Sequence, residues 1–196
     1  LMLRLQDAHC HNINFVTPEH VAPQVVEAIA LAIPRGLEIP IIYNTSGYDA
    51  IASLRCLEGL VDVYMPDFKV WKPETARRLL RATDYPAVAR AALTEMHRQV
   101  GTLRFGRDGL ARRGVLVRHL VMPGQLDESA SIFHWLHDEL SPDTYINIMG
   151  QYRPDHRVQQ NQRYVDIDRR PRSEECVAVL KAAREAGLWR IDKDPR

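Results

Sequence analysis

The segment from Ile39 to Lys69 reads IPIIYNTSGYDAIASLRCLEGLVDVYMPDFK, and it contains the pattern that decides the fold. Two short apolar runs, Ile39–Tyr43 and Val61–Met65, flank a stretch in which apolar residues recur at helical spacing. A strand, an amphipathic helix and a second strand in this order are typical of a βαβ unit with two parallel strands. Such near-continuous apolar strands are usually buried on both faces of a parallel sheet.

The same alternation continues on both sides of this segment. Further strands are predicted at His11–Val16, Val115–Met122 and Thr144–Met149. Helices are predicted from their capping residues and apolar spacing, with these starting points: Thr17-Pro18, Asp49, Pro73, Tyr85 (as far as Val100), Asp127 and Ser173 (ending at Gly187). Residues 102–114 interrupt the alternation and predict a small β-hairpin excursion with an Asp-Gly turn.

Five predicted strands are too few for a complete eight-unit barrel, which usually takes about 250 residues. We therefore expect an α/β fold, either a partial barrel or an open sheet that lacks its first unit. The whole chain, residues 1–196, is expected to form a single domain with a real core. The chain opens on Leu1, inside what reads as a helix end, so we expect further coding sequence before it.

Charge and composition argue against several classes of protein. The 26 Lys and Arg against 25 Asp and Glu give a formal net charge of +1, which offers no large basic surface for nucleic acid. The apolar runs fall far short of the roughly 20 residues that a membrane helix needs, and no signal pattern opens the chain. Three scattered cysteines, Cys10, Cys56 and Cys176, indicate a reducing compartment and buried structural thiols. We predict a cytoplasmic protein with neither nucleic acid nor membrane as a partner.

Polar residues follow the predicted strands at their carboxyl ends, where parallel α/β folds bind ligands. They lie in five stretches: Thr17–His20, Asn44–Tyr48, Pro66–Lys69, Met122–Gly124 and Gly150–Pro154. Arg118 stands within an apolar strand, and a buried guanidinium needs a partner. Together these residues predict a site for a small, polar and charged ligand.

Five longer runs around these strand ends, taken in order, cover nearly the whole chain: His11–His20, Tyr43–Tyr48, Val63–Lys69, Arg118–Gly124 and Asn147–Pro154. They resemble the radical S-adenosylmethionine (SAM) family, in the branch similar to pyruvate formate-lyase activating enzyme. The resemblance implies a partial (β/α)6-type, TIM-like barrel that lacks its first βα unit. It also implies SAM and a [4Fe–4S] cluster at the carboxyl-terminal mouth, where reductive cleavage of SAM gives a 5′-deoxyadenosyl radical that abstracts hydrogen from a substrate.

The resemblance assigns roles to residues in the first half of the chain. Glu19 stands where the family's glutamate meets the amino group of SAM. Asn44 and Thr45 match an Asp-Thr pair near the SAM and cation site. A Met-x-Asp-x-Lys stretch is matched at Met65, Asp67 and Lys69; its aspartate helps to bind a monovalent cation, and its lysine approaches the carboxylate of SAM. A possible cation site therefore consists of Thr45, Met65 and Asp67.

Three further residues are assigned in the second half. Arg118 matches an arginine that faces the site, and Gln151 and Tyr152 fall where the last strand contributes to the adenosine end. A lysine and an arginine on one rim would supply the positive charge that a carboxylate ligand needs.

In one respect the sequence departs from the family. The CxxxCxxC loop, whose cysteines hold three irons of the cluster, is absent from these 196 residues. The resemblance therefore implies that the cluster ligands precede Leu1 and that this polypeptide alone is an inactive fragment of a radical SAM enzyme. Its expected partners are SAM, an electron donor and a substrate whose identity stays open, a protein glycyl residue included.

Two other functions stay open. A non-enzymatic SAM-binding or scaffold module would keep the polar rim without a cluster. A metal-dependent barrel hydrolase would use the HxH of His9 and His11 as zinc ligands and Lys69 as a metal-bridging group, although this HxH precedes its predicted strand. Two other histidines are placed on a predicted surface helix and one in a polar loop: His134, His137 and His156.

Overall fold

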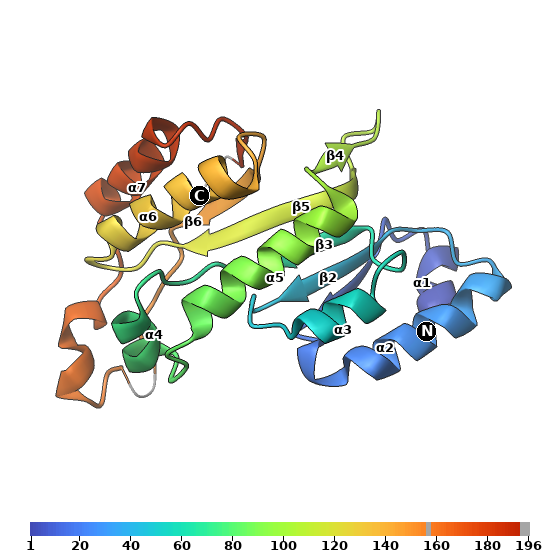
Figure 1. Ribbon diagram of the computed structural model, residues 1–196, viewed down its shortest axis with the longest axis horizontal. Coiled ribbons are helices and arrows are strands. Elements are labelled where there is room, and N and C mark those ends of the chain that lie inside the picture. Colours follow the sequence, from blue (N-terminus) through green and yellow to red (C-terminus); the bar gives the residue numbers. More distant parts are fainter. Residues whose placement is uncertain (156–157, 193–196) are drawn as a thin grey trace. The chain divides into compact units, whose positions relative to one another are not determined.

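A computed structural model describes residues 1–155 and 158–192 of the chain. Its fold is α/β, with a mostly parallel seven-stranded sheet that alternates with helices in this part of the chain (Figure 1). The sheet contains β1 (Ile13–Val16), β2 (Ile41–Thr45), β3 (Val63–Pro66), β4 (Arg104–Phe105), β5 (Ala111–Leu120), β6 (Tyr145–Met149) and β7 (Ile191–Asp192). The spatial order β1-β2-β3-β5-β6-β7 follows the chain order, while β4 pairs antiparallel with β5.

Seven α-helices are found in the described ranges: α1 (Met2–Asp7), α2 (Ala22–Ala32), α3 (Ile51–Cys56), α4 (Pro73–Leu79), α5 (Tyr85–Val100), α6 (Leu126–Trp135) and α7 (Ser173–Glu185). Shorter helical turns follow or connect them: η1 (Glu19–Val21), η2 (Ile33–Arg35), η3 (Leu136–Leu140) and η4 (Gln162–Ile167). Within residues 1–155 and 158–192, no helix is both long enough and apolar enough to cross a membrane.

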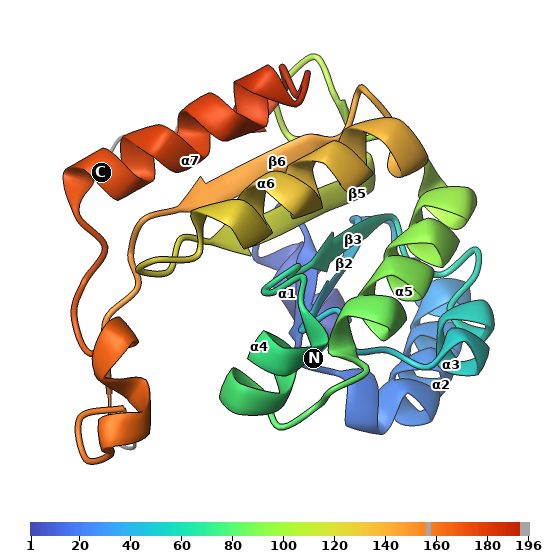
Figure 2. The same ribbon diagram turned by 60° about the vertical axis from the view of Figure 1, so that its left-hand side comes forward.

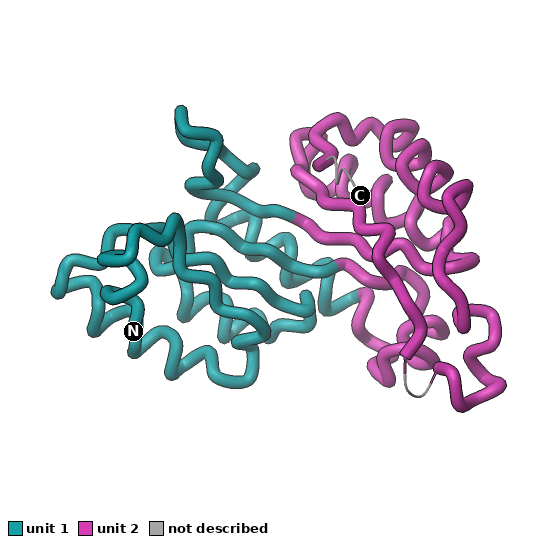
Figure 3. The backbone as a smooth tube through the Cα atoms, turned by 180° about the vertical axis from the view of Figure 1, so that it is seen from behind, with its two compact units in different colours: residues 1–67, 87–116 teal, residues 68–86, 117–196 magenta. Residues whose placement is uncertain are grey.

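The chain divides into two compact units, which Figure 3 distinguishes by colour. Unit 1 consists of residues 1–67 and 87–116, and unit 2 of residues 68–86 and 117–196. The long strand β5 contributes its first residues to unit 1 and its last residues to unit 2.

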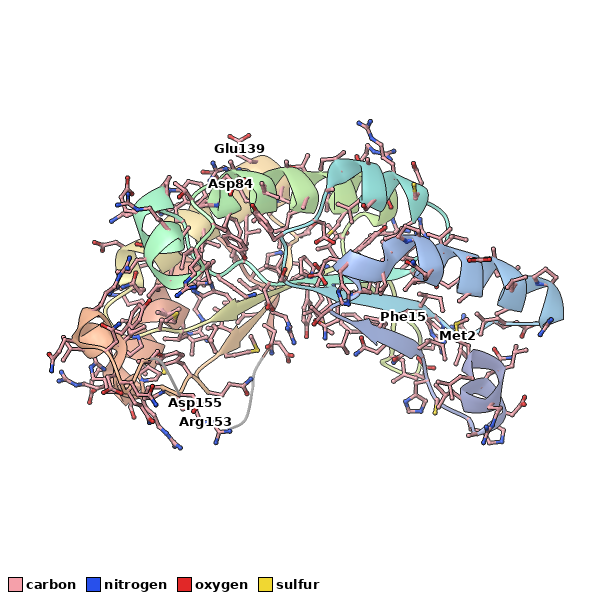
Figure 4. All side chains as sticks on the ribbon, turned by 90° about the horizontal axis from the view of Figure 1, so that it is seen from below. Met2, Phe15, Asp84, Glu139, Arg153 and Asp155 are labelled. Atoms are coloured by element: carbon pink, nitrogen blue, oxygen red, sulfur yellow. The ribbon has the colours of Figure 1, made fainter. Side chains whose placement is uncertain are left out.

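Unit 1 has its core around the central strands β2 and β3. Tyr43 and Tyr64 are fully buried in adjacent register, and their rings meet edge to face at 5.8 Å. The edge strand β1 is only partly covered, since Phe15, labelled in Figure 4, is half-buried. Val16 on the same strand is exposed. Gln6 on α1 donates from its amide to the Gly36 carbonyl at 2.8 Å, which ties the first helix to the loop before β2.

Unit 2 has its core beneath α6 and α7, which pack against each other beside β6 (Figure 2). Phe68 is fully buried there, with its ring edge to face against Trp135 at 5.7 Å. The buried carboxylate of Glu128 accepts hydrogen bonds from the backbone amides of Trp71 (2.7 Å) and Lys72 (3.0 Å) and from the Thr75 hydroxyl. Because α4 begins at Pro73, this carboxylate stabilises the start of that helix from another element.

Most of the elements predicted from the sequence are confirmed. All five predicted strands are present with shifted ends, and the hairpin within residues 102–114 is formed by β4 and β5. Pro73 opens α4, Ser173 opens α7, and α5 has the predicted bounds of Tyr85 and Val100.

Three predicted helix caps are wrong. Thr17 has φ +55° and is followed by η1, so α2 begins only at Ala22. Asp49 does not cap α3, because Ala50 holds the cap position and the Asp49 side chain turns inward. Asp127 lies inside α6, which begins one residue earlier.

The prediction that all three cysteines are buried is also wrong. Cys56 is exposed on α3, and Cys10 and Cys176 are half-buried. All three are free thiols.

Candidate functional site

The carboxyl ends of β1, β2 and β3 bring a group of the predicted residues together in unit 1. The Thr17 amide donates to the Asn44 carbonyl at 2.8 Å, and the Asp67 amide donates to the Thr45 carbonyl at 3.0 Å. Asn44 is also the register partner of Met65. The three strands are parallel in this part of the sheet, so their ends meet at one edge, as the sequence predicts.

The side chains at this edge form a hydrogen-bonded acidic cluster of Glu19, Thr45 and Asp49. The Thr45 hydroxyl lies 2.8 Å from Oε1 of Glu19 and 2.5 Å from Oδ2 of Asp49. The Ser46 amide donates to Oε1 of Glu19 at 2.6 Å, and the Gly47 amide donates to the Thr45 hydroxyl at 3.1 Å. A hydroxyl has one proton to donate, so it can serve only one of the two carboxylates. The other contact is a hydrogen bond only when that carboxyl group carries a proton.

The environment of the cluster places this proton on Asp49. Burial raises the pKa of Asp49 to about 6. The Glu19 charge also acts upward, and the hydrogen bonds that Asp49 shares with Thr45 and Tyr43 act downward. Burial also acts upward on Glu19, but the hydrogen bonds from Ser46 and Thr45 outweigh it and lower the pKa of Glu19. The Tyr43 hydroxyl donates to Oδ1 of Asp49 at 3.2 Å. Below about pH 6, Asp49 therefore holds the proton and donates to Thr45, and Thr45 donates to Glu19, which is ionised because its own pKa is lowered.

One oxygen of Glu19 remains without a partner. Its Oε2 atom is buried, and the described residues offer it no hydrogen bond, although the side chain as a whole is half-buried. A buried and unsatisfied carboxylate oxygen is costly, because it has lost water without gaining a donor. A ligand that brings a donor, and above all a cationic donor, would remove this cost.

Unit 2 contains a second group, in which the backbone around Lys69 is held by three hydrogen bonds. The Phe68 amide donates to the Arg118 carbonyl at 2.9 Å, and the Lys69 amide donates to the Tyr85 hydroxyl at 3.0 Å. The Phe68 carbonyl lies 2.8 Å from Nδ1 of His119. A carbonyl only accepts, so this nitrogen carries the proton. The buried His119 thus fixes the strand exit that carries Lys69.

Arg118 corrects one prediction, because its side chain is half-exposed and not buried. Side chains alternate along β5, so Val117 and His119 enter the core while Arg118 and Leu120 share the less covered face. The structure places Arg118 one residue before His119 on this strand, and its role toward SAM stays a prediction.

Lys69 and Tyr152, both predicted site residues, line a cavity of about 380 Å³ within unit 2. Its other walls are mainly apolar and come from α4, the end of β5 and η4, and they include Leu79, Leu80, Leu120, Met122, Tyr164 and Ile167. A volume in this range is typical of small-molecule sites, which span about 300 to 1,000 Å³.

Gln151 is exposed and lies with Tyr152 on the loop that follows β6, where Figure 4 labels Arg153 and Asp155. Gln151, Tyr152 and Arg153 line a second cavity of about 450 Å³ together with Arg170. The two arginines make this second cavity more polar than the first.

Sequence reasoning missed two residues of these groups. The sequence around Asp49 predicts a helix cap, since an acidic residue just before a helical pattern is usually one. Arg81, at the wall of the first cavity, has φ +59°, a conformation that the neighbouring sequence does not predict.

The HxH pair is placed at the amino end of β1. His9 and His11 are both exposed and precede Ile13, so they do not end the strand. Among residues 1–155 and 158–192, no group of three or more His, Cys, Asp or Glu side chains could hold a metal ion. His156 lies outside the described residues.

No family model matches the chain. It is 29% identical over 180 residues to an uncharacterized protein of Methanocaldococcus jannaschii, MJ0674. The alignment covers 90% of this chain and 47% of that protein, so the chain spans about half the length of its relative.

Proposed function

We propose that this chain is the SAM-binding part of a radical SAM enzyme and that Glu19 receives the ammonium group of SAM. The observation that supports the proposal most strongly is the unsatisfied Oε2 of Glu19, at the residue that the resemblance assigns to that ammonium. The lowered pKa of Glu19 adds to it, because Glu19 is then an anion that can meet a cationic group.

The surroundings of Glu19 suit a cationic ligand group. Oε1 is already held by the Thr45 hydroxyl and the Ser46 amide, so the carboxylate is oriented before any ligand arrives. An ammonium group has three N–H donors and a full positive charge, and its hydrogen bonds to a carboxylate are among the stronger ones in proteins. The side chain that binds is thus preorganised, which lowers the entropic cost of binding.

Topology supports the finer part of the fold proposal, a partial (β/α)6-type barrel. The strand order follows the chain order without a reversal, whereas a doubly wound sheet reverses at a switch point. Right-handed crossovers in an unreversed order put successive helices on the same face of the sheet, which is the winding of a barrel.

The cysteines of this chain do not fit a [4Fe–4S] cluster. Cys10, Cys56 and Cys176 are free, lie far apart in the sequence and form no cluster-binding group in the described ranges. In the proposed enzyme the cluster ligands would have to come from outside these 196 residues. With such a cluster, SAM would supply radical chemistry for hydrogen abstraction, to which this chain would contribute the binding of SAM.

The remaining assigned residues keep their predicted roles within the proposal. Within unit 1, Asn44, Thr45, Met65 and Asp67 would neighbour the SAM and cation site. The roles that the resemblance gives to Lys69, Arg118, Gln151 and Tyr152, all in unit 2, stay predictions. The contribution of this chain is then to bind and orient SAM and to keep Glu19 ionised. The substrate and the electron donor stay open.

Titration calorimetry with SAM, S-adenosylhomocysteine and 5′-methylthioadenosine tests the proposal. The first two carry the amino acid end and are expected to bind, whereas methylthioadenosine lacks it and should bind at least about tenfold more weakly. Equal affinity for all three compounds, or no SAM binding at about 1 mM, would contradict the proposal. A SAM-binding module without a cluster would give the same affinities, and it is distinguished by the absence of SAM cleavage when the native protein is reconstituted with iron and sulfide under reducing conditions.

A further inference from the structure

We infer that the 380 Å³ cavity of unit 2 binds a small amphipathic carboxylic acid, with an apolar body inside the cavity and its anionic end at Arg81. The inference goes beyond SAM binding: Lys69 and Tyr152 of the same cavity have predicted roles toward SAM, but Arg81, the residue that carries the inference, has none.

The walls of the cavity favour an apolar body. Leu79 and Leu80 come from the end of α4, Leu120 and Met122 from the end of β5, and Ile167 from η4. Binding is favourable when side chains of this kind cover apolar ligand surface. A strongly hydrated molecule would gain no such stabilisation.

The two tyrosines of the wall present their rings to the cavity and use their phenolic protons elsewhere. The Tyr152 hydroxyl donates to the Ile167 carbonyl at 3.0 Å, and the Tyr164 hydroxyl donates to the Arg78 carbonyl at 3.3 Å. These bonds leave the aromatic faces as further apolar surface.

Charge decides the polar end of the ligand. The charged side chains among the described lining residues are Lys69 and Arg81, both cationic, and no acidic residue stands among them. Arg81 is exposed at this wall, and a guanidinium can hold a carboxylate with two parallel hydrogen bonds. An amine of the same length would be repelled.

The backbone of Arg81 gives an independent observation. With φ +59°, Arg81 adopts the left-handed conformation just after α4, where glycine is the usual residue because it has no Cβ to strain. An arginine in this position costs free energy that glycine would not. Backbone strain of this type occurs mainly at functional sites.

The wall formed by η4 is fastened to α4 beside Arg81. Arg78 forms a bidentate ion pair with Asp166, with both N···O distances at 2.8 Å. The Arg78 guanidinium also donates to the Arg163 carbonyl at 3.3 Å. These contacts hold the cavity wall in place before a ligand enters, which lowers the cost of binding.

Octanoate and octylamine serve as probes of equal length and opposite charge. Calorimetry is expected to detect octanoate binding and at least about tenfold weaker binding of octylamine. Methyl-labelled methionine localises the site, since the signal of Met122 in the wall should shift with octanoate while that of Met96, in the core of unit 1, should not. Equal binding of both probes, no octanoate binding, or an unshifted Met122 signal would overturn the inference.

Arg81→Gln should weaken octanoate binding at least about fivefold. Arg77→Gln, at an exposed arginine on α4 that does not line the cavity, should leave it unchanged. Arg81→Gly should bind octanoate as weakly as Arg81→Gln does. Its melting temperature should not be lower than that of the parent chain, because glycine accepts the backbone conformation. Unaltered octanoate affinity in the Arg81 variants, or a glycine variant that binds octanoate normally but melts earlier, would assign Arg81 a structural role only and overturn the inference.

SAM binding, measured on the same samples, keeps the two proposals apart. Arg81→Gln is expected to bind SAM like the parent chain. Octanoate binding without SAM binding would contradict the proposed function alone, and SAM binding without octanoate binding would contradict this inference alone.

Discussion

Asp49 reaches back to the end of β2, where its Oδ2 atom lies 2.5 Å from the hydroxyl of Thr45. Gly47 stands between them with φ +79°, and this left-handed turn lets the chain fold back over four residues. Asp49 is almost fully buried as a result, and its burial raises its pKa to about 6, so that below this pH it is the uncharged neighbour of Thr45. The electrostatics of the candidate site therefore depend on a residue that belongs to a turn.

The pH dependence of stability follows from this contact. The pKa of Asp49 is raised to about 6 in the folded chain, so between about pH 4 and pH 6 the folded state keeps a proton that the unfolded state has released. The contribution of Asp49 to stability is present below about pH 4 and is lost as the pH rises through 6, by up to about 3 kcal/mol.

Asp49→Asn, which carries no titrating proton, should remove this loss. Urea unfolding of both proteins at several pH values measures the difference in their free energies of unfolding. The free energy of unfolding of the variant should rise relative to that of the parent chain as the pH rises from about 4 to about 7. A difference that is constant over this range would show that Asp49 does not hold the proton, and Asp127→Asn, at an exposed site, gives the flat baseline.

Glu128 should be a main stabilising residue of unit 2. Glu128→Ala leaves the amides of Trp71 and Lys72 and the Thr75 hydroxyl without their acceptor, and we expect a loss of about 3 kcal/mol in the free energy of unfolding. Glu139→Ala, at an exposed site, should change it by less than about 0.5 kcal/mol. Equal effects of the two substitutions in urea unfolding would contradict the role given to Glu128.

Gly114 should tolerate no side chain. It has φ +125°, and an added Cβ would run into the backbone of Thr102 and Leu103 where the hairpin joins β5. Gly114→Ala is expected to lower the free energy of unfolding by about 3 kcal/mol or more.

Gly109→Ala provides the matched control. Gly109 also has a positive φ, +76°, but nothing lies within 4 Å of its added Cβ, so backbone strain alone should cost about 1 kcal/mol. A loss at Gly114 no larger than that at Gly109, measured by thermal or urea unfolding, would mean that the backbone of the hairpin moves aside.

The sequence predicts the strands and most helix positions because local patterns determine them. The alternation around Ile39–Lys69 fixes the parallel strands, and the parallel arrangement then brings Asn44, Thr45 and Asp67 to one edge. What the sequence does not predict depends on the direction in which a side chain points. Asp49 matches a capping pattern but turns into the core, and the hydrogen-bonded partners of such a residue lie outside its local window.

Arg118 and Arg81 show two further limits of the same kind. An arginine in an apolar strand predicts burial, yet period-two alternation puts Arg118 on the less covered face of β5. The positive φ of Arg81 is a property of the folded chain, since packing around the end of α4 sustains it against its intrinsic cost.

The affinity for SAM of three proteins tests the central claim most directly: the parent chain, Glu19→Gln and Glu27→Gln. The glutamine at position 19 keeps the size of the side chain and removes the charge that the ammonium group would meet, whereas Glu27 is an exposed residue on α2. We predict that the parent chain and Glu27→Gln bind SAM within about twofold of each other and that Glu19→Gln binds it at least about tenfold more weakly, with an unchanged melting temperature. Equal SAM affinity of all three proteins, or a parent chain that does not bind SAM, would contradict the account.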